Sequence, residues 1–126
     1  MAEKHRILLV DDEPSVVKIV SRRLEGEGFD VLVAMDGQEG LMKAQCERPD
    51  LIVLDVKLPK LTGYELCAAL KRDPRYQKIP VIMFTAKATE HDEKLAMESG
   101  ANAFVQKPFR AQELLERIRA LIELSV

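Results

Sequence analysis

Short apolar runs alternate with longer amphipathic segments along the chain of 126 residues. The runs are rich in β-branched residues and are bounded by turn-forming residues, which is typical of strands buried on both faces of a sheet. One of them, Leu51–Asp55, is apolar until it ends on a carboxylate. The pattern predicts five strands, at residues 6–10, 31–34, 51–55, 80–84 and 103–105.

The segments between these runs carry apolar residues at three- and four-residue spacing, which predicts helices. Asp36 with Glu39, and Thr62 with Glu65, match the pattern of a capping box at a helix start. Gly100 is placed to end the fourth helix. The helices are expected to start at Pro14, after Asp36, at Thr62, at Thr89 and before Leu114, and the third is expected to continue to Pro74.

Five strands that alternate with five helices specify an α/β fold with a doubly wound parallel sheet. A length of 126 residues suits one domain, so we expect a single domain over residues 1–126. No internal repeat, low-complexity segment or linker interrupts the alternation.

Composition narrows the functional class. The formal net charge of −2 provides no bulk attraction to nucleic acid, so no direct nucleic-acid binding is expected. The apolar runs are far shorter than the ~20 residues of a membrane-spanning helix, and the N-terminus lacks the apolar core of a secretory signal. Cys46 and Cys67 have no histidine in register and indicate no disulfide framework. We therefore expect a soluble cytoplasmic protein without membrane association.

Polar residues follow the predicted strands at the ends where chemistry gathers in parallel α/β sheets. Asp11 and Asp12 follow the first strand, Asp55 ends the third, Thr85 follows the fourth and Lys107 comes after the fifth. Right-handed crossovers bring these strand ends to the same edge of the sheet. Three crowded carboxylates repel one another unless a cation lies among them, and Mg²⁺ favours oxygen ligands of this kind. The sequence therefore predicts a Mg²⁺ site.

The same cluster suits phosphoryl transfer to Asp55. This reaction requires mainly positioning of the reactants and neutralisation of charge. A bound Mg²⁺ and the ammonium of Lys107 would together neutralise the three carboxylates. We therefore expect Asp55 to accept a phosphoryl group.

The sequence resembles the receiver domain of bacterial two-component response regulators over its whole length. Each matching motif alone is weak evidence, but all of them together, in this order and at these spacings, form a specific signature. The motifs are residues 7–10 with Asp11-Asp12, residues 49–55 with Leu58-Pro59 and Gly63, residues 79–86, Gly100-Ala101 and residues 107–109. The resemblance implies a flavodoxin-like (βα)5 fold with strand order 2-1-3-4-5.

By this resemblance, Asp12 and Asp55 would coordinate Mg²⁺, or Mn²⁺ as an alternative ion. The backbone carbonyl of Lys57 would be a third ligand. Asp11 would act through a metal-bound water.

The resemblance also implies the roles of the remaining site residues. Asp55 would take a phosphoryl group from a sensor histidine kinase, a phosphotransfer protein or a small phosphodonor. Thr85 would donate its hydroxyl to one phosphoryl oxygen, Lys107 would pair with another, and the Lys107-Pro108 bond would be cis. Phe104 stands at the family's aromatic switch position. Phosphorylation would then remodel the surface of the fourth helix, fifth strand and fifth helix, through which an output partner or domain would respond.

Two lysines, Lys57 and Lys87, stand at positions that tune dephosphorylation in the family that this chain resembles. We expect the Lys57 side chain to shield the phosphoryl group from water and to slow its hydrolysis, with a smaller effect from Lys87. In this interpretation the chain catalyses only its own phosphorylation and dephosphorylation and is not an enzyme acting on outside substrates.

Two other classes remain open from the residues alone. Phosphatases with an aspartate nucleophile usually carry a second acid two residues later, where this chain has Lys57. Flavin-binding modules of similar topology hold phosphate on free N–H groups at a helix N-terminus, whereas the acidic run from Asp11 to Glu13 would repel a phosphate without a metal.

Overall fold

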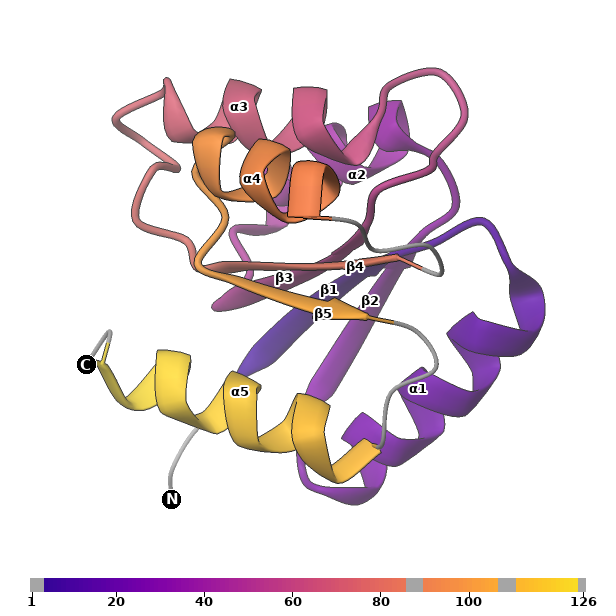
Figure 1. Ribbon diagram of the computed structural model, residues 1–126. Helices are drawn as coiled ribbons and strands as arrows, with labels where there is room; N and C mark the ends of the chain where they lie inside the picture. Colours follow the sequence, from indigo (N-terminus) through magenta and orange to yellow (C-terminus); the bar gives the residue numbers. More distant parts are fainter. Residues whose placement is uncertain (1–3, 86–89, 107–110, 125–126) are drawn as a thin grey trace.

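The computed structural model describes residues 4–85, 90–106 and 111–124. They form a sheet between two layers of helices (Figure 1). The strands are β1 (Arg6–Val10), β2 (Asp30–Ala34), β3 (Leu51–Asp55), β4 (Val81–Thr85) and β5 (Ala103–Gln106). The helices are α1 (Pro14–Gly26), α2 (Gly37–Glu47), α3 (Gly63–Lys71), α4 (Glu90–Glu98) and α5 (Ala111–Leu124). In these described stretches, no helix has the length and apolar character needed to cross a membrane.

All five strands pair in parallel, in the order β2-β1-β3-β4-β5. This arrangement confirms the doubly wound α/β fold, and the strand boundaries agree with the sequence pattern to within one residue. The chain continues from β1 to β2 on one side and returns to β3 on the other. The carboxyl ends of β1 and β3 therefore flank the switch point, which is the usual binding site in open α/β sheets.

Two apolar clusters pack on opposite faces of the sheet. One joins the sheet to α2, α3 and α4, and the other joins it to α1 and α5, as the two helix layers in Figure 1 show. Alternate residues of β3 belong to different clusters, with Ile52 and Leu54 in one and Leu51 and Val53 in the other. Every residue of β3 is buried, so its position is fixed from both sides.

The two predicted capping boxes have different outcomes. At α3 both halves form, because the Glu65 N–H donates to the Thr62 hydroxyl at 3.2 Å and the Thr62 N–H donates to the Glu65 carboxylate at 3.1 Å. At α2 the Glu39 N–H donates to Asp36 at 2.8 Å, as expected. The second predicted bond, from the Asp36 N–H to the Glu39 carboxylate, is wrong. That carboxylate instead accepts from the N–H of the preceding residue, Met35, at 2.7 Å.

Helix α3 ends at Lys71, before the expected limit at Pro74. The Lys71 ammonium donates to the carbonyls of Gln77 and Ile79 at 3.1 and 2.7 Å, and to the side chain of Asn102 at 3.3 Å. These bonds use the three donors of the ammonium and hold the connection to β4 against the start of β5. Burial lowers the pKa of Lys71 below its usual value.

The capping box at α3 predicts a measurable loss on truncation. Thr62→Ala should lower the free energy of unfolding by about 1 kcal/mol, because the N–H of Glu65 loses its acceptor. Thr62→Ser keeps the hydroxyl, so its free energy of unfolding should stay close to that of the unsubstituted protein. Urea unfolding followed by circular dichroism measures both, and equal losses in the two variants would contradict the role assigned to the hydroxyl.

Candidate functional site

Three aspartates come together at the carboxyl edge of the sheet. Asp11 and Asp12 follow β1 directly, and Asp55 is the last residue of β3. Val10 pairs with Leu54 in the parallel register, so the next residues, Asp11 and Asp55, lie side by side at the edge of the sheet. The N–H of Asp11 also donates to the last carbonyl of β2 at 3.1 Å. The expected convergence of these strand ends is therefore present in the structure.

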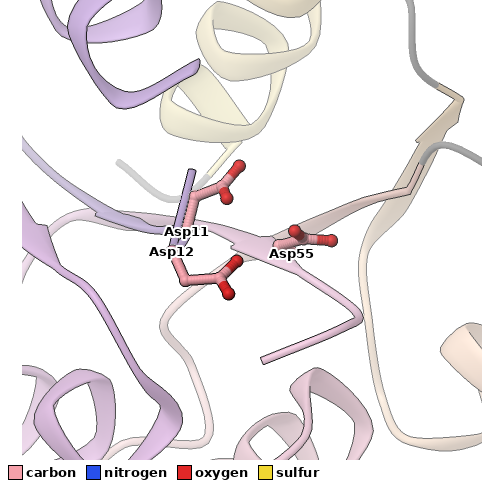
Figure 2. A group of neighbouring side chains, drawn as sticks. All are labelled: Asp11, Asp12 and Asp55. Carbon is pink, nitrogen blue, oxygen red and sulfur yellow. The ribbon is translucent and has the colours of Figure 1, made fainter. Parts of the chain in front are cut away.

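The carboxylates of this cluster are close enough to share one ion. One oxygen from each of Asp11, Asp12 and Asp55 lies within 4.8 Å of the others, and Figure 2 shows the three groups extending to the same side of the sheet edge. The side chains of Asp11 and Asp55 are 0% and 4% exposed, whereas Asp12 is exposed. An ion in this cluster would be reached from solvent past Asp12.

Main-chain groups fix the two buried carboxylates. The Glu13 N–H donates to Asp11 at 2.9 Å, and the Lys57 N–H donates to Asp55 at 3.3 Å. The second bond keeps the main chain of Lys57 beside the Asp55 carboxylate. Gly63 lies behind Asp55, where a β-carbon would overlap the Asp55 carbonyl oxygen. The carboxylate of Asp55 is therefore held by a tightly packed backbone.

The donor set fits a hard divalent cation. Carboxylate and main-chain oxygens are the ligands that Mg²⁺ takes in proteins, usually with several waters. The cluster could therefore hold a metal ion.

Thr85 and Phe104 lie on the same face of the sheet. Phe104 pairs with Met83 in the register between β4 and β5, and Thr85 follows Met83 by two residues, which returns it to the same face. Thr85 is 3% exposed and lies one position beyond Phe84, the partner of Asp55. Phe104 is half-buried and packs against the cluster on the α3 and α4 side. The hydroxyl and the aromatic ring thus occupy neighbouring strands, as expected.

Three predicted site residues, Lys87, Lys107 and Pro108, lie outside the described residues. Their roles, and the expected cis bond before Pro108, stay predictions. Both cysteines are free, Cys46 exposed and Cys67 buried, which agrees with the expected lack of a disulfide framework.

Two features near the site were not predicted from the sequence. The Tyr64 hydroxyl, on α3, lies 3.3 Å from the carbonyl of Asp92 and 3.4 Å from its carboxylate, on α4. Burial, with the nearby Asp92 charge, raises the pKa of Tyr64 above its usual value. Gly37, at the start of α2, packs against the chain that follows β3. The Asp36-Gly37 pair before α2 is the only sequence signal for the close packing at Gly37. No sequence signal indicates the contact between Tyr64 and Asp92.

Comparison with known proteins identifies related sequences. A sequence model described as the response regulator receiver domain matches residues 7–119. The chain is 48% identical over 122 residues to the alkaline phosphatase synthesis transcriptional regulatory protein PhoP of Bacillus subtilis, covering 95% of this chain and 49% of the relative. It is 43% identical over 117 residues to the DNA-binding response regulator MtrA of Mycolicibacterium smegmatis, covering 93% and 50%. The chain thus spans about half the length of these curated relatives.

Solved structures with the same fold match nearly the whole length of this chain. A CheY-like response regulator receiver domain from Methanospirillum hungatei is 31% identical, with a TM-score of 0.91 and coverage of 98% of this chain and 97% of that one. The receiver domain of a sensor histidine kinase from Pseudomonas aeruginosa is 29% identical, with a TM-score of 0.89 and coverage of 96% and 99%. That structure is described with a magnesium ion coordinated in its active site cleft.

The acidic cluster predicts a response to Mg²⁺ that depends on Asp12. Asp12→Ala should raise the melting temperature without metal by a few degrees, because it relieves repulsion among the three carboxylates. The same change should abolish most of the stabilisation by millimolar Mg²⁺, which acts by binding the folded form. Asp30→Ala serves as control. Asp30 is the first residue of β2, at the sheet edge away from the acidic cluster, and its substitution removes an equal charge from an exposed position. An undiminished Mg²⁺ response in Asp12→Ala would refute the metal assignment.

Proposed function

The chain belongs to the response regulator receiver domains, and on this premise we propose that it is a Mg²⁺-dependent phosphoacceptor whose Asp55 carries the phosphoryl group. The observation that supports this most is the position of Asp55. Its carboxylate is buried, lies within 4.8 Å of those of Asp11 and Asp12, and ends a central strand at the switch point of the sheet.

In the proposed reaction, a carboxylate oxygen of Asp55 forms a bond to phosphorus as the bond from phosphorus to a histidine nitrogen of the donor breaks. The electron pair of the broken bond stays on that nitrogen. Asp12, Asp55 and the carbonyl of Lys57 would hold Mg²⁺, and Asp11 would act through a metal-bound water. When bound, the ion neutralises charge on the phosphoryl oxygens. Thr85 donates its hydroxyl to one of these oxygens, and Lys107 pairs with another.

The family consists of signalling proteins, which are partners of histidine kinases, and the proposed chemistry is limited to the chain itself. Residues 1–126 act as one receiver domain that catalyses its own phosphorylation and dephosphorylation. The donor is a sensor histidine kinase, a phosphotransfer protein or a small phosphodonor. Relatives such as MtrA are named as DNA-binding regulators, but this chain spans only about half their length, and we assign no nucleic-acid binding to these 126 residues.

The proposed output is a change in the surface formed by α4, β5 and α5. Thr85 would move toward the phosphoryl group, and Phe104 would fill the space it leaves. Their placement on one face of adjacent strands supports this coupling, because packed side chains of this kind have discrete alternative arrangements. Phe104 has no hydroxyl, so its own contribution to a partner contact would be apolar.

The two other functional classes have less support. The family match over residues 7–119 favours a receiver over an aspartate-nucleophile phosphatase or a flavin-binding module. Lys57 also occupies the position where such phosphatases usually have their second acid.

Labelling with a small phosphodonor tests the proposal. Incubation with acetyl phosphate and Mg²⁺ should add one base-labile phosphoryl group at Asp55, detected by mass spectrometry. Asp55→Asn should abolish labelling, because an amide oxygen is a far poorer nucleophile than a carboxylate. Asp50→Asn is the matched control, since Asp50 is an exposed aspartate at the other end of β3. Full labelling of the Asp55→Asn variant would exclude Asp55 as the acceptor.

The lifetime of the phosphorylated form is proposed to depend on Lys57. Its main chain lies beside the Asp55 carboxylate and its side chain is exposed. Hydrolysis requires a water in line with the bond between phosphorus and Asp55. An ammonium group paired with a phosphoryl oxygen would cover that approach.

Lys57→Asn should therefore speed autodephosphorylation several-fold, through better access for water. Lys87→Glu should have a smaller effect. Decay of the phosphorylated protein is timed in excess Mg²⁺ after removal of the donor. Decay that is unchanged or slower in Lys57→Asn would reject the shielding role.

A further inference from the structure

The connection between β3 and α3, residues 56–62, lies against the start of α2. Its base is closed where the Gly63 N–H donates to the Val56 carbonyl at 2.9 Å. Its tip is attached to α2, because the Gly37 N–H donates to the Pro59 carbonyl at 3.2 Å. The start of α2 and the tip of this connection, more than twenty residues apart in sequence, therefore lie side by side.

Gly37 is buried and leaves no space for a side chain. A β-carbon built there would overlap the Leu61 carbonyl oxygen and would lie 2.6 Å from the Leu61 β-carbon and 2.7 Å from its carbonyl carbon. Two of these three atoms are main chain, so a larger residue at position 37 must displace the connection itself. Gly40, one turn further along α2, is different, because its nearest neighbours are methyl groups of Val10 and Leu66.

The tip of the connection has a constrained backbone. Lys60 has a φ of 70°, and the N–H of Leu61 donates to the Pro59 carbonyl at 2.8 Å. A hydrogen bond across one residue with positive φ marks the rarer and more strained kind of γ-turn. The Lys60 ammonium lies 3.6 Å from the Asp36 carboxylate, which also accepts from the Glu39 N–H. That N–H, and then the Lys60 charge, lower the pKa of Asp36 below its usual value.

We propose that Gly37 is a positioning residue for the metal centre, acting together with the turn at Lys60 to hold the tip of the 56–62 connection. The connection carries Lys57, whose main chain is fixed beside Asp55 and whose carbonyl is the proposed third ligand. With its base tied at Gly63 and its tip tied at Gly37, the carbonyl of Lys57 has little freedom to move. Groups that orient metal ligands from outside the coordination shell commonly change metal affinity without touching the ion.

This inference rests on the proposed Mg²⁺ site, and Mg²⁺ affinity is its direct readout. Mg²⁺ is titrated into the full chain, and the dissociation constant is taken from the amide NMR shifts of Asp55 and Lys57. Gly37→Ala should weaken binding on the order of tenfold. Gly40→Ala is the matched control in the same helix, because it stresses side-chain packing and leaves the connection in place; its dissociation constant should stay unchanged even if its stability falls.

Two variants of Lys60 test the positioning role without adding a side chain at the crowded position 37. Lys60→Gly relieves the positive φ and loosens the tip, so the fold should be as stable or more stable while Mg²⁺ binds roughly threefold more weakly. Lys60→Asn removes the same charge, but asparagine tolerates this conformation better than most residues and keeps the turn stiffer than glycine does. Its Mg²⁺ affinity should exceed that of Lys60→Gly.

The outcomes separate the two proposals. Weaker Mg²⁺ binding in a folded Gly37→Ala, or in Lys60→Gly relative to Lys60→Asn, supports the positioning role. Unchanged affinity in every folded variant overturns that role while leaving the metal site intact. If Gly37→Ala does not fold, the Lys60 pair alone gives the answer. A lack of Mg²⁺ binding by the unsubstituted protein would instead overturn the proposed function.

Discussion

The Asp55 carboxylate stands at the end of a strand that is buried on both faces, and the surrounding structure must accommodate its charge. Apolar helix layers hold β3 from both sides, so the carboxylate has little freedom to move away. Asp11 is also buried, and Asp12 lies at the solvent side of the same cluster. Concentrated negative charge at the edge of an apolar core favours a divalent cation and, with it, a phosphoryl group.

Close backbone packing positions the residues around this charge. Gly63 allows the chain after β3 to pass directly behind Asp55, and Gly37 allows the tip of the same connection to lie on α2. At both positions the neighbouring atoms include main chain, which cannot move aside as a flexible side chain can. The geometry of the acidic cluster therefore depends on Gly37 and Gly63, where a side chain would collide with the neighbouring backbone.

The face of the sheet that carries Thr85 and Phe104 is also the face covered by α3 and α4. Two polar contacts join this layer together. Tyr64 on α3 reaches Asp92 on α4, and Lys71 at the end of α3 reaches the segment before β5. A change at Thr85 would thus act on a layer whose members already contact one another, which is a physical basis for the proposed transmission from the phosphoryl site toward α4 and β5.

The sequence by itself determined the order of the elements, the parallel α/β class and the convergence of Asp11, Asp12 and Asp55. Hydrophobic periodicity and turn chemistry are local, and parallel strands end at one edge, so these features follow without knowledge of long-range contacts. Only the tertiary structure decided that Glu39 accepts from Met35, that Lys71 closes the connection to β4, and that Gly37 meets Leu61. These contacts depend on the distance and angle at which separate elements pack. Local residue patterns carry no record of that geometry.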